Sequence, residues 1–178
     1  MSPGKLLVLR VIDYPNRSYI LYEYNIPYPK GRTSPALQSS VAGSNLWYIL
    51  RMKKITQSYT IKAPVKEVWQ AFFDPSVINR WGGGPAFISE TENSDFSLWG
   101  GEIHGKNLTI IKYKTLVQDW FDGNKWTKPS KVTFTFKSGD GQTVVGLLHE
   151  NIPDASVDDI DEGWKKFYLG PIKDLLEQ

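Results

Sequence analysis

Residues 154–178, DASVDDIDEGWKKFYLGPIKDLLEQ, say most about the architecture of this chain. Large apolar side chains recur there at every third or fourth position, a spacing that predicts one long amphipathic helix. The apolar positions are Ile160, Trp164, Phe167, Tyr168, Ile172, Leu175 and Leu176. Pro171 lacks a backbone N–H, so we expect a kink near residues 167–171. A helix with three bulky rings on one face needs a broad, concave partner, and a curved sheet provides one.

The residues before this helix predict that sheet. Residues 54–62 alternate apolar and polar side chains, as in a half-buried strand. Proline and aspartate signals then place two short helices, at about residues 64–73 and 76–81. Further strands are predicted near residues 87–91, 96–102, 108–120, 131–137 and 143–150, with Asp140-Gly141 as a type I′ hairpin turn. This order predicts an α+β fold in which a curved antiparallel β-sheet wraps around a long C-terminal α-helix, with two short helices after the first strand.

Composition and charge narrow the function classes. Of the 21 Lys/Arg and 19 Asp/Glu, six and two lie in residues 1–51, which leaves 15 basic and 17 acidic residues for 52–178. Phosphate binding needs a concentrated basic face, so no nucleic-acid partner is expected. The chain has no Cys, which excludes disulfides, thiolate nucleophiles and Cys-based metal sites. Because it shows neither a bilayer-length apolar run nor a signal-peptide pattern, we expect a cytoplasmic protein without a membrane span.

Residues 1–51 differ in character from residues 52–178, which are predicted to form the main domain. Residues 5–13 and 18–26 could be two strands of a hairpin, and residues 27–44 read as a linker rich in Pro, Gly and Ser. One interpretation is an extension that pairs with the main sheet or with another chain. The other is that Met52, which directly precedes the first strand of the main domain, is the native start.

Strand alternation predicts which side chains face the last helix, because every second residue of a strand points to the same side. The predicted inward set, with rings from the helices, comprises Tyr59, Phe73, Trp81, Leu116, Gln118, Trp120, Phe134, Phe136, Leu147, His149, Trp164, Phe167 and Tyr168. These residues could form a solid core. Alternatively, they could line a cavity of a few hundred Å³ that holds a small hydrophobic molecule, with Gln118 or His149 fixing its polar end.

The chain offers little for catalysis or metal binding. His149 could be a general base in such a pocket, or a hydrogen-bonded polar group at the edge of the core; the second is preferred because no catalytic partner is visible. The plausible metal ligands are Glu102, His104, His149 and Glu150, and no two have the spacing of a metal site. We therefore expect no catalytic residue, no metal and no cofactor.

Several short motifs, in order, resemble the helix-grip, START-like (SRPBCC) superfamily and, within it, the C-terminal domain of activators of heat shock protein 90 ATPase. They are residues 61–69 (IKAPVKEVW), 73–75 (FDP), Trp81, 101–105 (GEIHG), 119–120 (DW), 132–136 (VTFTF), 149–153 (HENIP) and 163–164 (GW). The resemblance covers about residues 53–178 and none of 1–51. It implies a helix-grip fold.

The chain also departs from that family's pattern. Many bacterial relatives carry Arg-Pro-Gly-Gly before the third strand, where this chain has residues 91–96, TENSDF. The eukaryotic co-chaperone has a second, N-terminal domain that contacts the chaperone, and residues 1–51 leave no room for it. The resemblance therefore implies the fold more directly than the co-chaperone activity.

Three function hypotheses follow. The leading one is a non-enzymatic domain that holds a small apolar ligand between sheet and helix. The alternative is a single-domain co-chaperone, a protein-interaction module that stimulates a heat shock protein 90 ATPase; a cyclase- or hydrolase-type enzyme using His149 ranks last. A cavity above about 300 Å³ lined by the predicted rings would favour the ligand, and a filled core would weaken it. The oligomeric state stays open.

Overall fold

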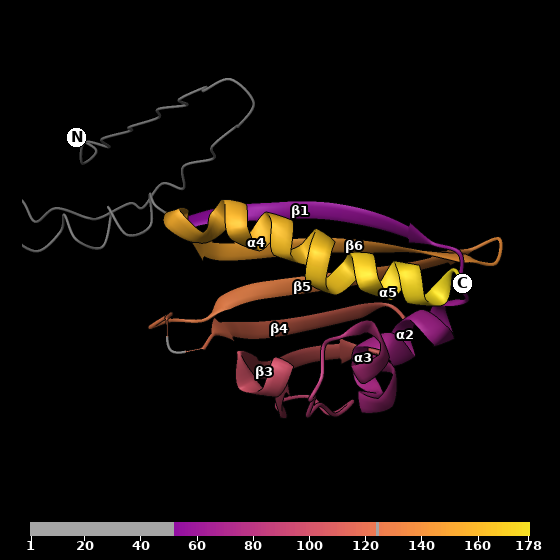
Figure 1. Ribbon diagram of the computed structural model, residues 1–178, viewed down its shortest axis with the longest axis horizontal. Helices are drawn as coiled ribbons and strands as arrows, with labels where there is room; N and C mark the ends of the chain where they lie inside the picture. Colours follow the sequence, from indigo (N-terminus) through magenta and orange to yellow (C-terminus); the bar gives the residue numbers. More distant parts are fainter. Residues whose placement is uncertain (1–51, 124) are drawn as a thin grey trace, which may run out of the picture. The chain divides into compact units, whose positions relative to one another are not determined.

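The computed structural model describes residues 52–123 and 125–178, so the two predicted segments within residues 1–51 lie outside the described part (Figure 1). The described residues form a six-stranded antiparallel sheet with strand order β1-β6-β5-β4-β3-β2. Its strands are β1 (Met52–Ile61), β2 (Asp95–Leu98), β3 (Ile103–Ile111), β4 (Thr115–Asp122), β5 (Ser130–Gly139) and β6 (Gln142–Pro153). The predicted α+β, helix-grip architecture is confirmed.

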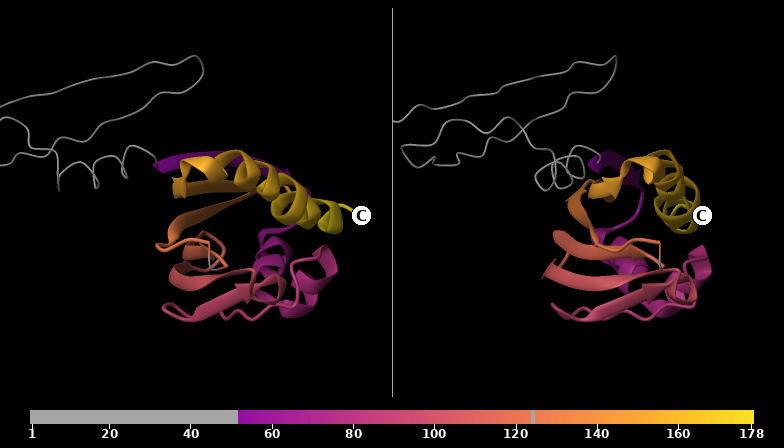
Figure 2. Two further views of the ribbon diagram at one scale, coloured as in Figure 1. Left: turned by 60° about the vertical axis from the view of Figure 1, so that its left-hand side comes forward. Right: turned by 90° about the vertical axis from the view of Figure 1, so that its left-hand side faces the viewer.

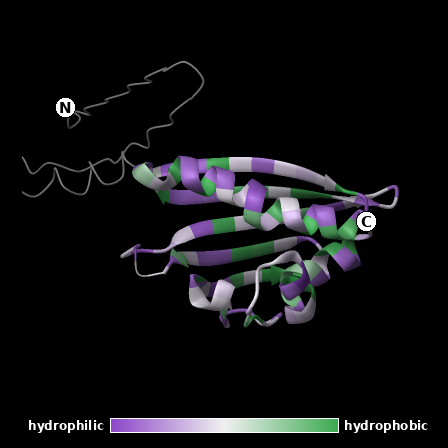
Figure 3. Cartoon of the chain, viewed as in Figure 1, coloured by the Kyte–Doolittle hydropathy of each residue, from purple (hydrophilic) through white to green (hydrophobic). Residues whose placement is uncertain are grey.

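The helices lie on one face of this sheet. The C-terminal helix, made of α4 (Val157–Gly163), the π-helical turn η3 (Trp164–Tyr168) and α5 (Leu169–Leu176), crosses the sheet from the β1 side (Figures 1 and 2). Hydrophobic and hydrophilic residues alternate along the strands (Figure 3). In β6 the residues at every second position from Thr143 to His149 are buried, so one face of the sheet meets the helices. We call this helix-covered side the inner face and the opposite side the outer face.

The two short helices after β1 follow from local signals. The carbonyl of Pro64 accepts the N–H of Val68 at 3.1 Å, which starts α2 (Val65–Phe73). The Asp74 carboxylate accepts the Ser76 N–H at 2.8 Å and caps α3 (Pro75–Trp81). Trp81 then fixes α3 against α2, because its indole N–H donates to the Ala71 carbonyl at 2.8 Å.

Turns explain where the strand predictions were right and wrong. Asp140 and Gly141 have φ of 49° and 74°, which confirms the hairpin between β5 and β6. The single strand predicted over residues 108–120 is wrong: β3 and β4 meet at a tight turn in which Tyr113 takes φ 63° and the Lys114 N–H donates to the Ile111 carbonyl at 2.9 Å. No Gly or Asn marks that turn. The strand expected at residues 87–91 is reduced to one bridge between Phe87 and Ser97.

The C-terminal helix changes geometry one turn before Pro171. In η3 the Leu169 N–H bonds the Trp164 carbonyl, an i→i−5 hydrogen bond, so the turn holds one residue more than an α-helical turn. Trp164 and Tyr168 both face the sheet, whereas Phe167 is 63% exposed. The prediction that Phe167 faces the sheet is therefore wrong, because the wider turn rotates it to the solvent side.

No helix among residues 52–123 and 125–178 is long and apolar enough to cross a membrane.

Candidate functional site

Most of the predicted inward set comes together between the sheet and the helices. The buried members are Phe73, Trp81, Leu116, Gln118, Trp120, Phe134, Phe136, Leu147, His149, Trp164 and Tyr168. Tyr59 is half-buried on β1, where its hydroxyl donates to Gln57 Oε1 at 2.7 Å. Phe167 is the exception described above. Strand alternation and helical spacing together located the interior, and the π-helical turn explains why Phe167 does not face it.

The buried rings pack against each other. Ring centroids are 4.8 Å apart for Trp120 and Trp164 and 5.0 Å apart for Trp164 and Tyr168. The Phe134 ring stacks on Tyr168 at 5.8 Å with an interplanar angle of 19°. These are contact distances for aromatic pairs, so this part of the interior matches the solid-core alternative.

Several further aromatic residues belong to this cluster and were absent from the predicted set, among them Phe72, Trp99 and Trp126. Phe72 lies 5.0 Å from Phe134, half-buried Trp99 lies 5.8 Å from Trp81, and half-buried Trp126 lies 6.2 Å from His149. Phe72 is on the apolar face of α2 and could have been included on that signal. Trp99 and Trp126 lie in irregular segments, where no periodicity reveals which way a side chain points.

His149 links the C-terminal helix to the sheet. The indole N–H of Trp164 donates to His149 Nδ1 at 3.1 Å. Nε2 therefore carries the ring proton and donates to the Ser130 hydroxyl at 2.7 Å, and that hydroxyl donates to the Trp120 carbonyl at 3.3 Å. Burial lowers the pKa of His149 to about 3, so the ring is neutral at pH 7.

This geometry bears on the catalytic alternative. A general base works best with a pKa near the operating pH and with a ring nitrogen open to substrate. Both nitrogens of His149 are engaged by neighbours, and its pKa is far below neutrality. The arrangement supports the hydrogen-bonded core group that the sequence favoured.

Gln118 takes part in a second buried chain. The indole N–H of Trp120 donates to Gln118 Oε1 at 2.9 Å, and Gln118 Nε2 donates to Asn107 Oδ1 at 2.7 Å. The Asn107 amide continues to the Ser89 carbonyl at 3.0 Å. The polar atoms proposed as handles for a ligand thus bind other residues of the protein. Asn107 and Ser130 were not predicted, because their partners lie on other strands or loops.

Among the described residues, no three His, Cys, Asp or Glu side chains lie close enough to hold a metal ion. The candidates are also separated by the sheet: His149 is buried on the inner face, whereas His104 lies on the outer face.

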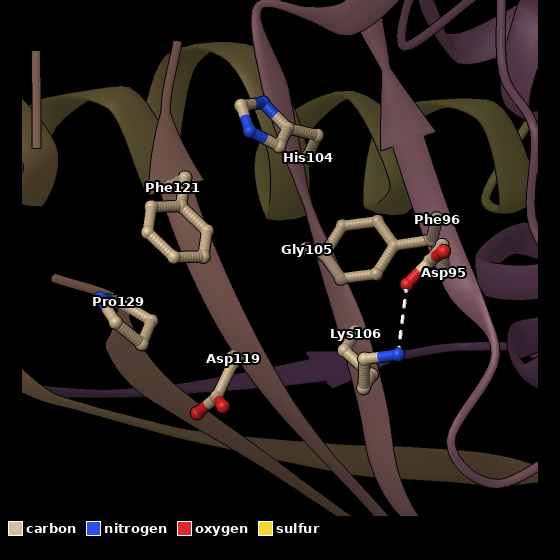
Figure 4. Close-up of a pocket in the computed structure, with 8 residues that line it drawn as sticks. All are labelled: Asp95, Phe96, His104, Gly105, Lys106, Asp119, Phe121 and Pro129. Carbon is tan, nitrogen blue, oxygen red and sulfur yellow. Dashed lines mark ion pairs between the residues drawn. The ribbon is translucent and has the colours of Figure 1, made fainter. Parts of the chain in front are cut away.

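The outer face carries a pocket of about 440 Å³ that the sequence did not reveal (Figure 4). We call it the outer groove; Asp95, Phe96, His104, Gly105, Lys106, Asp119, Phe121 and Pro129 line it. The His104 and Phe121 rings stack with centroids 5.5 Å apart and an interplanar angle of 10°. Lys106 Nζ lies 3.0 Å from an Asp95 carboxylate oxygen. The groove therefore combines an aromatic wall with charged side chains and is open to solvent.

Comparison with known proteins places the fold in context. A family model described as activator of Hsp90 ATPase homolog 1-like protein matches residues 62–177. An activator of 90 kDa heat shock protein ATPase homolog from Dictyostelium discoideum is 41% identical over 111 residues, which are 60% of this chain and 28% of that protein. An uncharacterised protein of Schizosaccharomyces pombe is 28% identical over 149 residues, 83% of this chain and 44% of that one. This chain thus spans less than half the length of these relatives.

A solved structure gives a similar result. The crystal structure of an HSP90 activator from Plasmodium falciparum superposes with a TM-score of 0.62 at 26% identity. The match covers 71% of this chain and 96% of that chain.

Proposed function

The chain belongs to the family of activator of Hsp90 ATPase homolog 1-like proteins, and on that premise we propose that it is a non-enzymatic protein-binding module that stimulates the ATPase of an Hsp90-type chaperone. One observation favours the protein-binding module over the other two hypotheses. The rings that would hold a small ligand touch one another, and their polar neighbours Gln118 and His149 are hydrogen-bonded within the protein. A filled interior leaves the surface as the place where binding occurs.

The comparisons support this choice of partner. The Dictyostelium discoideum relative is named as an activator of the chaperone's ATPase, and the Plasmodium falciparum protein is described as an HSP90 activator. The match covers 96% of the solved Plasmodium falciparum chain, so the likeness to a protein described as an HSP90 activator extends over nearly all of that chain. We include in the proposal that residues 52–178 form the domain and residues 1–51 a separate extension.

The test is a turnover assay. Hsp90 purified from Dictyostelium discoideum is titrated with the full chain while ATP hydrolysis is followed, and we expect a saturable increase in turnover. The chain alone is the control, because hydrolysis by the chain itself would mimic activation. Unchanged turnover together with no detectable binding at saturating chain would overturn the proposal.

One observation favours the small-ligand alternative as a second candidate. The indole N–H of Trp69 is fully buried and has no hydrogen-bond partner among the described residues. A buried unpaired donor costs about 1–3 kcal/mol, which an acceptor on a bound molecule would recover. Phe73 and Phe136 of the predicted set flank this indole, with centroids 4.8 and 5.1 Å away.

Intact-mass measurement separates the two candidates. Protein purified from its own source is compared under native and denaturing conditions. A native excess that disappears on denaturation would reveal a bound small molecule and begin to identify it. Identical masses would leave the protein-binding module as the sole candidate.

A further inference from the structure

We propose that the outer groove is the docking site for a basic side chain, an arginine or lysine beside apolar residues, that a partner protein presents to the sheet. The inference rests on the proposed function for the partner being a protein. It adds where that partner binds and what chemistry the groove selects.

The first argument is the unpaired carboxylate in the groove. Asp119 is half-buried on β4 and forms no hydrogen bond or ion pair with a described residue. Its cross-strand neighbour Lys106 is already held by Asp95 at 3.0 Å and by the Asn93 carbonyl at 3.2 Å. The three charged side chains of the groove therefore leave one negative charge without a partner, and a cation is the group that satisfies it.

The surroundings of Asp119 set the strength of this attraction. Lys131, on β5, is the other cross-strand neighbour of Asp119, and it in turn lies opposite Glu150 on β6. Charges thus alternate in sign across five strands, from Asp95 to Glu150. The positive charges of Lys106 and Lys131 weaken the electrostatic attraction of the Asp119 carboxylate for a free cation. A cationic side chain therefore needs apolar contacts as well in order to bind there.

The second argument is the wall that provides this apolar contact. The stacked rings of His104 and Phe121 form one side of the groove, and Pro129 lies near Asp119 (Figure 4). A guanidinium or the methylene stem of a lysine packs well on such ring faces while its charged end reaches a carboxylate.

Binding to the chaperone gives the first test. Affinities of the full chain and its variants for Dictyostelium discoideum Hsp90 are measured by calorimetry. We expect Asp119→Asn to weaken binding at least about fivefold, and Asp119→Arg to weaken it further, because a desolvated charge pair is lost and then reversed. Asp174→Asn is the matched control: Asp174 is an exposed acid on α5, away from the groove, and its loss should change affinity less than about twofold.

A peptide titration tests the groove without the chaperone. The ¹⁵N-labelled full chain is titrated with an acetylated, amidated Leu-Arg-Leu peptide and with its citrulline analogue, which is the same shape without the charge. We expect amide shifts on β3 and β4 with the arginine peptide, and shifts reduced at least threefold with citrulline or with Asp119→Asn.

The two tests distinguish the two proposals. Chaperone activation that survives both Asp119 substitutions at unchanged affinity would overturn the groove and leave the proposed function standing. The chain could instead show arginine-dependent amide shifts on β3 and β4 and yet not bind the chaperone. That result would support the outer groove as a docking site for a basic side chain and would overturn the proposal that the chaperone is its partner. Equal shifts with both peptides, or shifts elsewhere on the sheet, would overturn the groove.

Discussion

His149 shows how one buried residue can position a whole helix. Its ring joins Trp164 on the C-terminal helix to Ser130 on β5, so helix and sheet share one hydrogen-bonded link. Strand alternation predicted that this histidine faces inward. Alternation could not predict Ser130 as its partner, because register between distant strands decides which side chains meet.

The depressed pKa of His149 predicts a pH dependence of stability. The unfolded chain gains a proton near pH 6.5, whereas the folded chain does so near pH 3, so protons favour unfolding across that window. The contribution is fully present above pH 6.5 and is lost as the pH falls toward 3. Between pH 7 and 5 we expect a loss of roughly 2 kcal/mol in the free energy of unfolding. Urea unfolding of the wild type and of His149→Gln measures it; equal pH dependence in the two proteins would contradict the prediction.

Ser130 offers a second test at the same site. Ser130→Ala leaves the His149 Nε2–H buried without an acceptor, which should cost about 1–3 kcal/mol of stability. Ser138 lies on the same strand and is exposed, so Ser138→Ala is the matched control and should change stability by less than about 0.5 kcal/mol. Chemical denaturation at pH 7 compares both. Similar costs for the two serines would show that the His149 link contributes nothing measurable.

At the scale of elements, the sequence predicted the extent of the C-terminal helix but not its internal geometry. The three-and-four spacing located it, and Pro171 signalled a distortion nearby. The π-helical turn itself lies before the proline and carries no sequence mark except Gly170. Phe167 was therefore assigned to the wrong side, since a helix of regular pitch would have turned it toward the sheet.

Gly170 and Gly163, in the same helix, should respond in opposite directions to alanine. A β-carbon at Gly170 would lie 2.0 Å from the Lys165 carbonyl oxygen, because the π-helical turn brings that backbone close. We expect Gly170→Ala to destabilise the domain by at least about 2 kcal/mol. Gly163 has helical φ and ψ and nothing within 4 Å of its β-carbon position, so Gly163→Ala should stabilise by up to about 1 kcal/mol. Thermal unfolding compares them; a neutral Gly170→Ala would mean that the turn is α-helical in solution.

At the scale of the whole molecule, the fold was predictable and the outer groove was not. The order of the elements, the helical spacing and the Asp140-Gly141 turn were enough to predict the architecture. Each of these signals depends only on residues that are close together in the sequence. The groove depends on which residues of three strands face one another. Its central pair, His104 and Phe121, is separated by 16 intervening residues and meets only through the register of β3 and β4. A missed turn between those strands was enough to hide it.

The domain boundary gives the last prediction. If residues 52–178 fold independently, a chain that begins at Met52 should unfold at the same temperature as the full chain, within about 2 °C, because the described part of the chain builds an extensive aromatic core of its own. Differential scanning calorimetry of both chains measures it, and Hsp90 turnover assayed in parallel shows whether residues 1–51 contribute to activation. A drop of 10 °C or more on truncation would instead mean that residues 1–51 pack on the domain. The first interpretation of these residues, an extension that pairs with the sheet, would then be favoured over a native start at Met52.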